Sequence, residues 1–288
     1  MTDDIETERV RRYYAEEIRA YCSLQSEALV KALASVPRER FLDPGPWLIR
    51  GFDADMGAPG RPTPDTDPRH VYHNVSISID PARHLFNGQP GTICLWLDAL
   101  QIKAGERAFH LGCGTGYYTA LMANMVGPEG RVVAMEVDSE LARRASKNLG
   151  EFDWVEVKEG DGRVDIPADL DAILINAGAT HPLAAWLDAM RPGGRMILPL
   201  TFTVDTLPQN IGKGGVLLVT RNADGYAARF ITPVAIYSCA RVRDSALNET
   251  LKTSFMKGVW FTVRRLRRDS HDLTSTCWLH GPDFCLSL

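Results

Sequence analysis

Short apolar segments alternate with helical patterns from about Ala104 onward, and this alternation constrains the fold more than any other feature of the chain. It is typical of a parallel sheet covered by helices. The expected strands are Arg107–Leu111, Arg131–Glu136, Trp154–Lys158, Asp171–Asn176 and Arg195–Leu200, and the expected helices are Tyr117–Met125, Ser139–Leu149 and Pro182–Met190. Gly215–Thr220 and Ala227–Tyr237, the second with a bend or bulge, are expected to close the sheet antiparallel. The predicted fold class is therefore α/β, with a mostly parallel seven-stranded sheet that ends in an antiparallel hairpin.

A glycine-rich turn joins the first of these strands to its helix. Gly112-Cys113-Gly114-Thr115-Gly116 has the spacing G-x-G-x-G. A dinucleotide-binding turn has the spacing G-x-G-x-x-G, which places a pyrophosphate on the helix end. The shorter spacing resembles the loop that binds S-adenosylmethionine.

Two carboxylates follow the next strands in the order that a nucleoside site requires. Glu136 ends the second strand, twenty residues after Gly116, where it can accept hydrogen bonds from both hydroxyls of a ribose. Asp161 follows the third strand, where it can accept from the exocyclic amine of adenine. Each carboxylate alone is more often a solvated loop residue, but the three elements in order favour a cofactor site.

Composition excludes several function classes. The formal net charge of -4 gives no bulk field toward nucleic acid or anionic lipid, so neither partner is expected. The acidic start lacks a secretory pattern and no apolar run reaches membrane-spanning length, so a cytoplasmic protein is expected. The six cysteines have no CxxC pair or familiar metal-ligand spacing, and we predict reduced thiols and no metal.

The flanking regions differ in character from this central part. One or two amphipathic helices are expected between Thr7 and Leu33, and a long loop over the proline-rich segment Pro44–Pro68. Ser245–Met256 is predicted to be helical, and Gly258–Arg264 and Cys277–Leu286 to be strands flanking a basic run. We expect a helical cap with acceptor-side loops over residues 1–103, a cofactor-binding domain over 104–237, and an extension packed on it over 238–288.

The stretch Gly160–Leu200 carries a specific family resemblance. Its GDGR motif, its Pro-x-x-x-Trp-Leu helix and its PGGR turn resemble the corresponding run of protein-L-isoaspartate O-methyltransferases, and Val36-Pro37-Arg38-Glu39-Arg40-Phe41 is similar to the start of that family. The resemblance covers about Val36 to Leu200. It implies a Rossmann-like class I methyltransferase fold, S-adenosylmethionine as methyl donor, and a carboxylate of a peptide, protein or small molecule as acceptor. The residues expected at the cofactor are His110, Gly112, Cys113, Gly114, Gly116, Glu136, Val137, Asp161, Gly162 and Asn176.

The chain departs from the family pattern at two positions. Gly88 stands where the family places a serine or threonine beside the methyl-accepting carboxylate. His110 stands where methyltransferases usually carry an acidic residue near the cofactor's ammonium group, and a neutral imidazole cannot supply that countercharge. Its alternative interpretation is a packed strand-end histidine without ligand contact.

The residues of the acceptor site are predicted from their order along the chain. By sequence order Asn87, Gly88, Gln89 and the proline-rich loop are expected to form its wall. An ionised carboxylate needs no general base, whereas a hydroxyl or amine acceptor would make His73, His84 or His181 candidates. The basic run Arg264, Arg265, Arg267 and Arg268 is interpreted either as steering an acidic acceptor or as a charged edge strand.

Three hypotheses follow from these departures. The first is an O-methyltransferase that modifies a carboxylate other than isoaspartate. The second keeps isoaspartate as the substrate, with a residue such as Thr92 replacing the lost hydroxyl. The third is a binding protein that retains the fold without the activity. A nicotinamide dehydrogenase is disfavoured by the spacing of the glycines.

Overall fold

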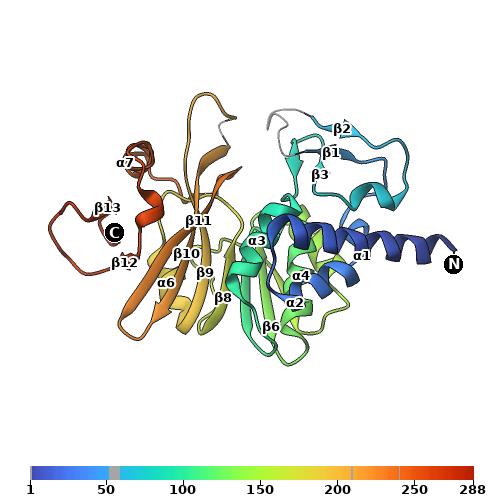
Figure 1. Ribbon diagram of the computed structural model, residues 1–288, viewed down its shortest axis with the longest axis horizontal. Coiled ribbons are helices and arrows are strands. Elements are labelled where there is room, and N and C mark those ends of the chain that lie inside the picture. Colours follow the sequence, from blue (N-terminus) through green and yellow to red (C-terminus); the bar gives the residue numbers. More distant parts are fainter. Residues whose placement is uncertain (1, 52–58, 209, 240) are drawn as a thin grey trace. The chain divides into compact units, whose positions relative to one another are not determined.

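The computed structural model describes residues 2–51, 59–208, 210–239 and 241–288. The chain forms two compact units (Figure 1). Unit 1 contains residues 1–106 and 113–159, and unit 2 contains residues 107–112 and 160–288. Among the described residues, no helix combines the length and the apolar character needed to cross a bilayer.

Unit 1 begins with the two predicted N-terminal helices and continues with a small antiparallel sheet in the order β2-β1-β3-β4. Its elements are α1 (Thr2–Cys22), α2 (Glu27–Ser35), η1 (Arg38–Phe41), β1 (Leu48–Arg50), β2 (Arg61–Pro62), η2 (Pro68–Val71), β3 (Ser76–Asp80), β4 (Leu85–Phe86), α3 (Pro90–Leu100), α4 (Tyr117–Val126), β6 (Arg131–Glu136), α5 (Ser139–Asn148) and β7 (Val155–Glu159). The predicted loop over 44–68 thus contains two short strands, and residues 52–58 of it lie outside the described part.

The elements of unit 1 begin where local chemistry allows them to. Pro90 occupies the first turn of α3, where its missing N–H is not needed. The Asp138 side chain accepts from the N–H of Leu141 and caps α5. Strands β6 and β7 pair in parallel, with Glu136 opposite Glu159 at their ends.

One buried arginine, Arg38, connects the segment that resembles the family's start to the residues that precede β3. Arg38 is fully buried, and its guanidinium donates to the carbonyl oxygens of Val71, His73 and Val75 at 2.7–3.0 Å. Its planar, forked donors suit three acceptors at once. Arg38 therefore holds residues 71–75 in place.

Unit 2 holds most of the larger sheet, in the order β13-β14-β12-β11-β10-β9-β8-β5. Figure 1 shows the long strands β9, β10 and β11 side by side. The elements are β5 (Arg107–Leu111), β8 (Leu170–Ile175), α6 (Ala184–Ala189), β9 (Met190–Phe202), β10 (Ile211–Asn222), β11 (Gly225–Tyr237), α7 (Ser245–Met256), η3 (Trp260–Thr262), β12 (Arg265–Arg267), β13 (Cys277–His280) and β14 (Cys285–Ser287).

The antiparallel closure predicted for this sheet is confirmed. β10 pairs antiparallel with both β9 and β11. Val216 pairs with Thr232 and Leu217 with Phe230, so β11 carries one extra residue, Ile231, which is the predicted bulge.

The prediction for the C-terminal extension was wrong in three details. Gly258–Arg264 is not a strand, because Trp260–Thr262 form a turn of 3-10 helix. The predicted strand Cys277–Leu286 is two strands that pair with each other, β13 and β14. The basic run does not form an edge, because β12 lies between β11 and β14 and its backbone is paired on both sides.

Candidate functional site

The glycine turn and Glu136 meet within unit 1. The carboxylate of Glu136 accepts from the backbone N–H of Gly114 at 2.8 Å through Oε2, and from those of Val137 and Asp138 at 2.9 and 3.2 Å through Oε1. Burial raises the pKa of Glu136, and these N–H groups oppose that shift. A carboxylate offers about four acceptor positions, so Oε2 keeps one for a ligand hydroxyl.

Gly116 allows the turn to pass into α4 against its neighbour α5. Its φ is +97°, and a Cβ there would lie 2.9 Å from Cδ1 of Leu149. Any other residue would be strained and would clash. Cys113 lies in the same turn, and its backbone N–H donates a hydrogen bond to the carbonyl oxygen of Met135 at 3.3 Å.

In unit 2, the ends of β5 and β8 lie next to each other. The N–H of Asn176 donates to Leu111 at 2.9 Å, and Nδ2 of Asn176 donates to the carbonyl of Gly112 at 3.3 Å. A Cβ on Gly112 would make a tight contact of 3.2 Å with the carbonyl oxygen of Asn176, and the φ of +76° at this position favours glycine.

His110 is a fully buried residue of β5. Desolvation lowers the pKa of His110 to about 3, so its imidazole is neutral at physiological pH. A neutral imidazole supplies no countercharge to an ammonium group, and the complete burial of the side chain also fits a packed strand-end histidine.

Asp161 is engaged by arginines of unit 2. Arg163 binds its carboxylate through Nε at 2.8 and 2.9 Å and through Nη2 at 2.6 Å, and Arg241 lies 3.7 Å away. The Arg163 guanidinium lowers the pKa of Asp161. The next residue, Gly162, accepts from Nε1 of Trp186 at 2.8 Å. Asp161 can reach an adenine amine only if Arg163 gives up part of this contact.

The segment around Gly88 has no room for the family's hydroxyl side chain. A Cβ on Gly88 would lie 2.5 Å from Cγ1 of Ile93 and 3.4 Å from the Tyr118 ring. Ile93 is buried, so it fills the volume that a serine would need. The Gly88 carbonyl also accepts from the Tyr118 hydroxyl.

The neighbours of Gly88 use their side chains to fix the backbone. Oδ1 of Asn87 accepts from the N–H of Ile77 at 2.8 Å, and Nε2 of Gln89 donates to the carbonyl of Asn74 at 2.7 Å. Both side chains therefore position this segment against β3 and the residues before it.

The remaining candidate bases are dispersed. His73 and His84 are exposed in unit 1. His181, in unit 2, is half-buried, stacks on Phe284, and has Nδ1 2.9 Å from the hydroxyl of Thr180. Burial lowers the pKa of His181.

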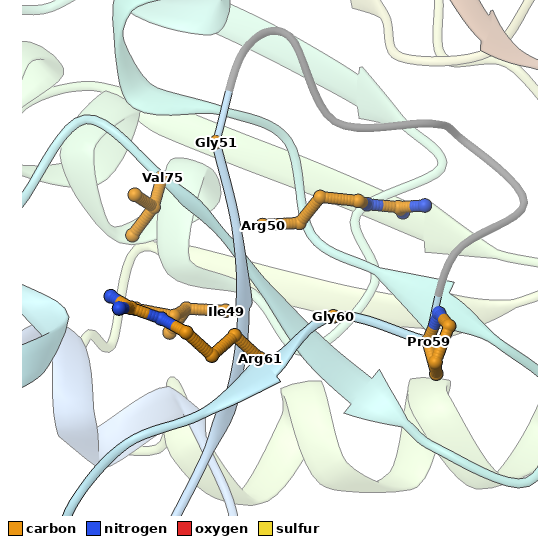
Figure 2. A pocket seen from close by; sticks show the side chains of 7 residues that line it. All are labelled: Ile49, Arg50, Gly51, Pro59, Gly60, Arg61 and Val75. Atoms are coloured by element: carbon orange, nitrogen blue, oxygen red, sulfur yellow. The ribbon is translucent and has the colours of Figure 1, made fainter.

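A pocket of unit 1 was not predicted from the sequence. It has a volume of about 400 Å³ and is lined by residues 49–51, 59–61 and 75 (Figure 2). Arg50 and Arg61 extend from β1 and β2 on its two sides, and the Arg50 guanidinium stands 3.8 Å from the centre of the Phe86 ring. Both arginines line the pocket, and the Arg61 side chain is exposed.

Comparisons with known proteins agree on one family. A profile of the protein-L-isoaspartate(D-aspartate) O-methyltransferase family matches residues 63–229. The protein-L-isoaspartate O-methyltransferase of Aeropyrum pernix is 33% identical over 64% of this chain and 64% of its own length, and that of Methanothrix thermoacetophila is 31% identical over 73% and 85%. The chain thus spans slightly less than two thirds of the Aeropyrum protein.

Solved structures show the same fold. A protein-L-isoaspartate O-methyltransferase superposes with a TM-score of 0.62 at 19% identity, over 85% of this chain and 69% of the other. A Plasmodium falciparum protein described as a putative member, in complex with S-adenosyl-L-homocysteine, gives 0.60 at 15% identity, over 80% and 98%.

The fold is therefore that of the class I, S-adenosylmethionine-dependent methyltransferases. Within that class, the chain belongs to the protein-L-isoaspartate(D-aspartate) O-methyltransferase family.

Proposed function

We propose that this protein transfers a methyl group to a carboxylate of a peptide or protein other than L-isoaspartate. The observation that carries the proposal is the packing of Ile93 into the volume of a side chain at residue 88, which removes the family's hydroxyl from the acceptor segment. Thr92 lies in the first turn of α3 with a half-buried side chain, and the alternative in which it replaces the lost hydroxyl predicts transfer to an isoaspartyl peptide.

The proposed cofactor residues remain those of the sequence analysis. Glu136 fits a ribose because its buried carboxylate is oriented by three N–H groups and keeps an acceptor position. Gly112 and Gly116 form the turn with positive φ values of +76° and +97°, and without side chains they leave its backbone open to a ligand. S-adenosylmethionine supplies an activated methyl group, so the protein needs mainly to align the acceptor oxygen with it.

The acceptor is proposed to bind along residues 59–90 of unit 1. Asn87 and Gln89 hold the backbone of that segment, so an acceptor meets a fixed wall. Arg61, an exposed residue that lines the nearby pocket, attracts a carboxylate, and no general base is needed because the acceptor is already ionised at neutral pH.

The finer functional division is also proposed. Residues 1–103 serve the acceptor, 104–237 the cofactor, and 238–288 form an extension of the sheet. We propose a cytoplasmic location because none of the cysteines in the described residues is joined in a disulfide.

The cofactor half of the proposal is tested by calorimetric titration with S-adenosylhomocysteine. Glu136→Gln removes the charge and one acceptor, and we expect a 10- to 100-fold weaker Kd, since hydrogen bonds to charged groups contribute about 1.5–3 kcal/mol. Glu159→Gln, at the paired end of β7, is the matched control and should bind as the parent does. Equal affinity of the two variants would remove Glu136 from the site.

The acceptor half is tested by methyl transfer to three peptides of one sequence. They carry an isoaspartyl residue, an aspartyl residue, or a free C-terminal carboxylate as the only acidic group. Base-labile release of methanol identifies the ester. We expect transfer to the aspartyl or C-terminal peptide to exceed transfer to the isoaspartyl peptide. The reverse order would refute the substrate proposal, and cofactor binding without any transfer would favour a binding protein.

A further inference from the structure

Four side chains with metal-binding atoms converge in the C-terminal extension of unit 2. His271, Cys277, His280 and Cys285 each offer one ligand atom, and all four atoms lie within 4.8 Å of one another. Their spacings along the chain, six, three and five residues, resemble none of the common zinc motifs, so the sequence analysis predicted no metal.

The fold of the extension explains why they meet. Cys277 and His280 lie at the two ends of β13, and Cys285 begins β14, where it pairs with His280. His271 comes from the loop between β12 and β13. The hairpin therefore brings together three ligands, and the loop adds the fourth.

The histidine of the loop is oriented for binding through one particular nitrogen. Nδ1 of His271 donates to the carbonyl oxygen of Asp269 at 2.9 Å, and a carbonyl can only accept. In the neutral imidazole, Nε2 then carries the free lone pair, and it lies 3.6 Å from Sγ of Cys277. A hydrogen bond like that from Nδ1 of His271 to the Asp269 carbonyl fixes the ring of a metal-bound histidine. The side chain of Asp269 is held in turn by Nε of Arg267, which donates to its carboxylate at 3.0 Å.

The other ligands are prepared in a similar way. Sγ of Cys277 accepts from the N–H and lies near the hydroxyl of Thr274, both at 3.4 Å. Nδ1 of His280 is buried and makes no hydrogen bond to any of the residues that the structure describes. A buried imidazole nitrogen without a partner is costly unless another group binds it.

We propose that these four residues bind one Zn²⁺ ion in a closed tetrahedral site. Tetrahedral coordination with ordinary Zn–S and Zn–N bonds places ligand atoms about 3.3–3.8 Å apart, a short contraction from the present arrangement. Two thiolates and two imidazoles suit Zn²⁺ rather than Mg²⁺ or Ca²⁺. On binding, both thiols lose their protons to solvent and two Zn–S bonds form.

The site is structural rather than catalytic. All four positions are filled by protein atoms, which leaves none for a water or a substrate. The ion joins β13, β14 and the loop at His271, in a part of the chain with only short strands.

Metal analysis of the full-length protein tests the site. After removal of metal with a chelator, the protein is titrated with Co²⁺ and then with Zn²⁺. We expect one equivalent of Co²⁺ to give the visible bands of a tetrahedral ion with a thiolate charge-transfer band, and Zn²⁺ to abolish both. Cys277→Ser should weaken the thiolate band, because Cys285 then supplies the only thiolate, and His271→Ala should change the tetrahedral bands. Cys22→Ser, a half-buried cysteine of unit 1, is the matched control.

Several results would overturn the proposal. They are absence of a tetrahedral spectrum in the folded parent protein, an unchanged spectrum in both ligand variants, or a Cys277–Cys285 disulfide found by mass spectrometry in protein purified under reducing conditions. If Cys277→Ser fails to fold, His271→Ala and the parent protein still decide the question. A thermal unfolding midpoint that falls in the parent protein, but not in His271→Ala, when chelator is added would support the site independently.

Discussion

Burial of His110 couples protonation to folding. Its pKa is about 3 in the folded chain, against about 6.5 for an exposed histidine. The unfolded chain therefore binds more protons between these values, so this contribution to stability is complete above pH 6.5 and is lost as the pH falls toward 3.

His110→Gln is expected to flatten the acid side of the stability profile. Between pH 7.5 and pH 5 the parent protein should lose about 2 kcal/mol more unfolding free energy than the variant, which has no such proton to bind. Urea unfolding of both proteins at the two pH values measures the difference. Parallel profiles would show that His110 is not desolvated as described.

The contact of Gly88 with Ile93 is open to a double-mutant cycle. Gly88→Ala should cost about 1–3 kcal/mol because the new methyl group meets a well-packed side chain. In an Ile93→Ala background, which removes Cγ1, the same change should cost at least about 1 kcal/mol less. Urea unfolding of the four proteins gives the coupling energy. Strictly additive costs would mean that Ile93 does not occupy this volume.

At the scale of elements, α7 depends on the capping residue that precedes it. The Asp244 side chain accepts from the N–H of Leu247 at 2.8 Å and caps the helix. Asp244→Ala should lower the unfolding free energy by about 1 kcal/mol, whereas Asp244→Asn, which keeps a capping oxygen, should be nearly neutral. Chemical denaturation compares the three proteins, and equal losses in both variants would point to charge rather than capping.

The elements that the sequence predicted well are those whose signals are local. Gly116 and Pro90 mark helix starts, and the buried strand Arg107–Leu111 is bounded by polar residues and glycine. The extension was harder to predict. The run of four arginines in five residues gave no strand signal, although the backbone of β12 pairs on both sides. The apolar residues around Trp260 indicated a strand but form a 3-10 turn.

The candidate site was predictable only in part, for the same reason. The glycine turn and Glu136 lie at strand ends that periodicity locates. Contacts such as Ile93 beside Gly88, or Arg163 on Asp161, depend on side-chain packing that spacing along the chain does not encode.

At the scale of the molecule, unit 2 is continuous with its extension. Phe230 of β11 lies 5.1 Å from Trp278 and 5.5 Å from both Phe255 and Trp260, measured between ring centres. Three of these four rings belong to the extension, so its aromatic core is shared with the central sheet.

Phe230→Ala should therefore destabilise the extension and the sheet together. We expect a loss of about 3–5 kcal/mol, with far-ultraviolet circular dichroism and tryptophan fluorescence still reporting a single transition. Phe261→Ala, which removes a ring that is 63% exposed, is the control and should cost less than about 1 kcal/mol. Two separate transitions would show that the extension folds by itself.

Because Arg38 is buried and supports the fold, a substitution at this position can abolish activity without touching the reaction. Its guanidinium joins three carbonyl oxygens that no other side chain shape could span, so nearly every replacement should reduce the yield of folded protein. In a saturation screen scored by methylation, position 38 would therefore rank among the most intolerant positions although it lies among tyrosine rings and backbone rather than at a reacting atom. Scoring the same library for abundance as well as turnover would separate this internal support from the residues that handle the acceptor.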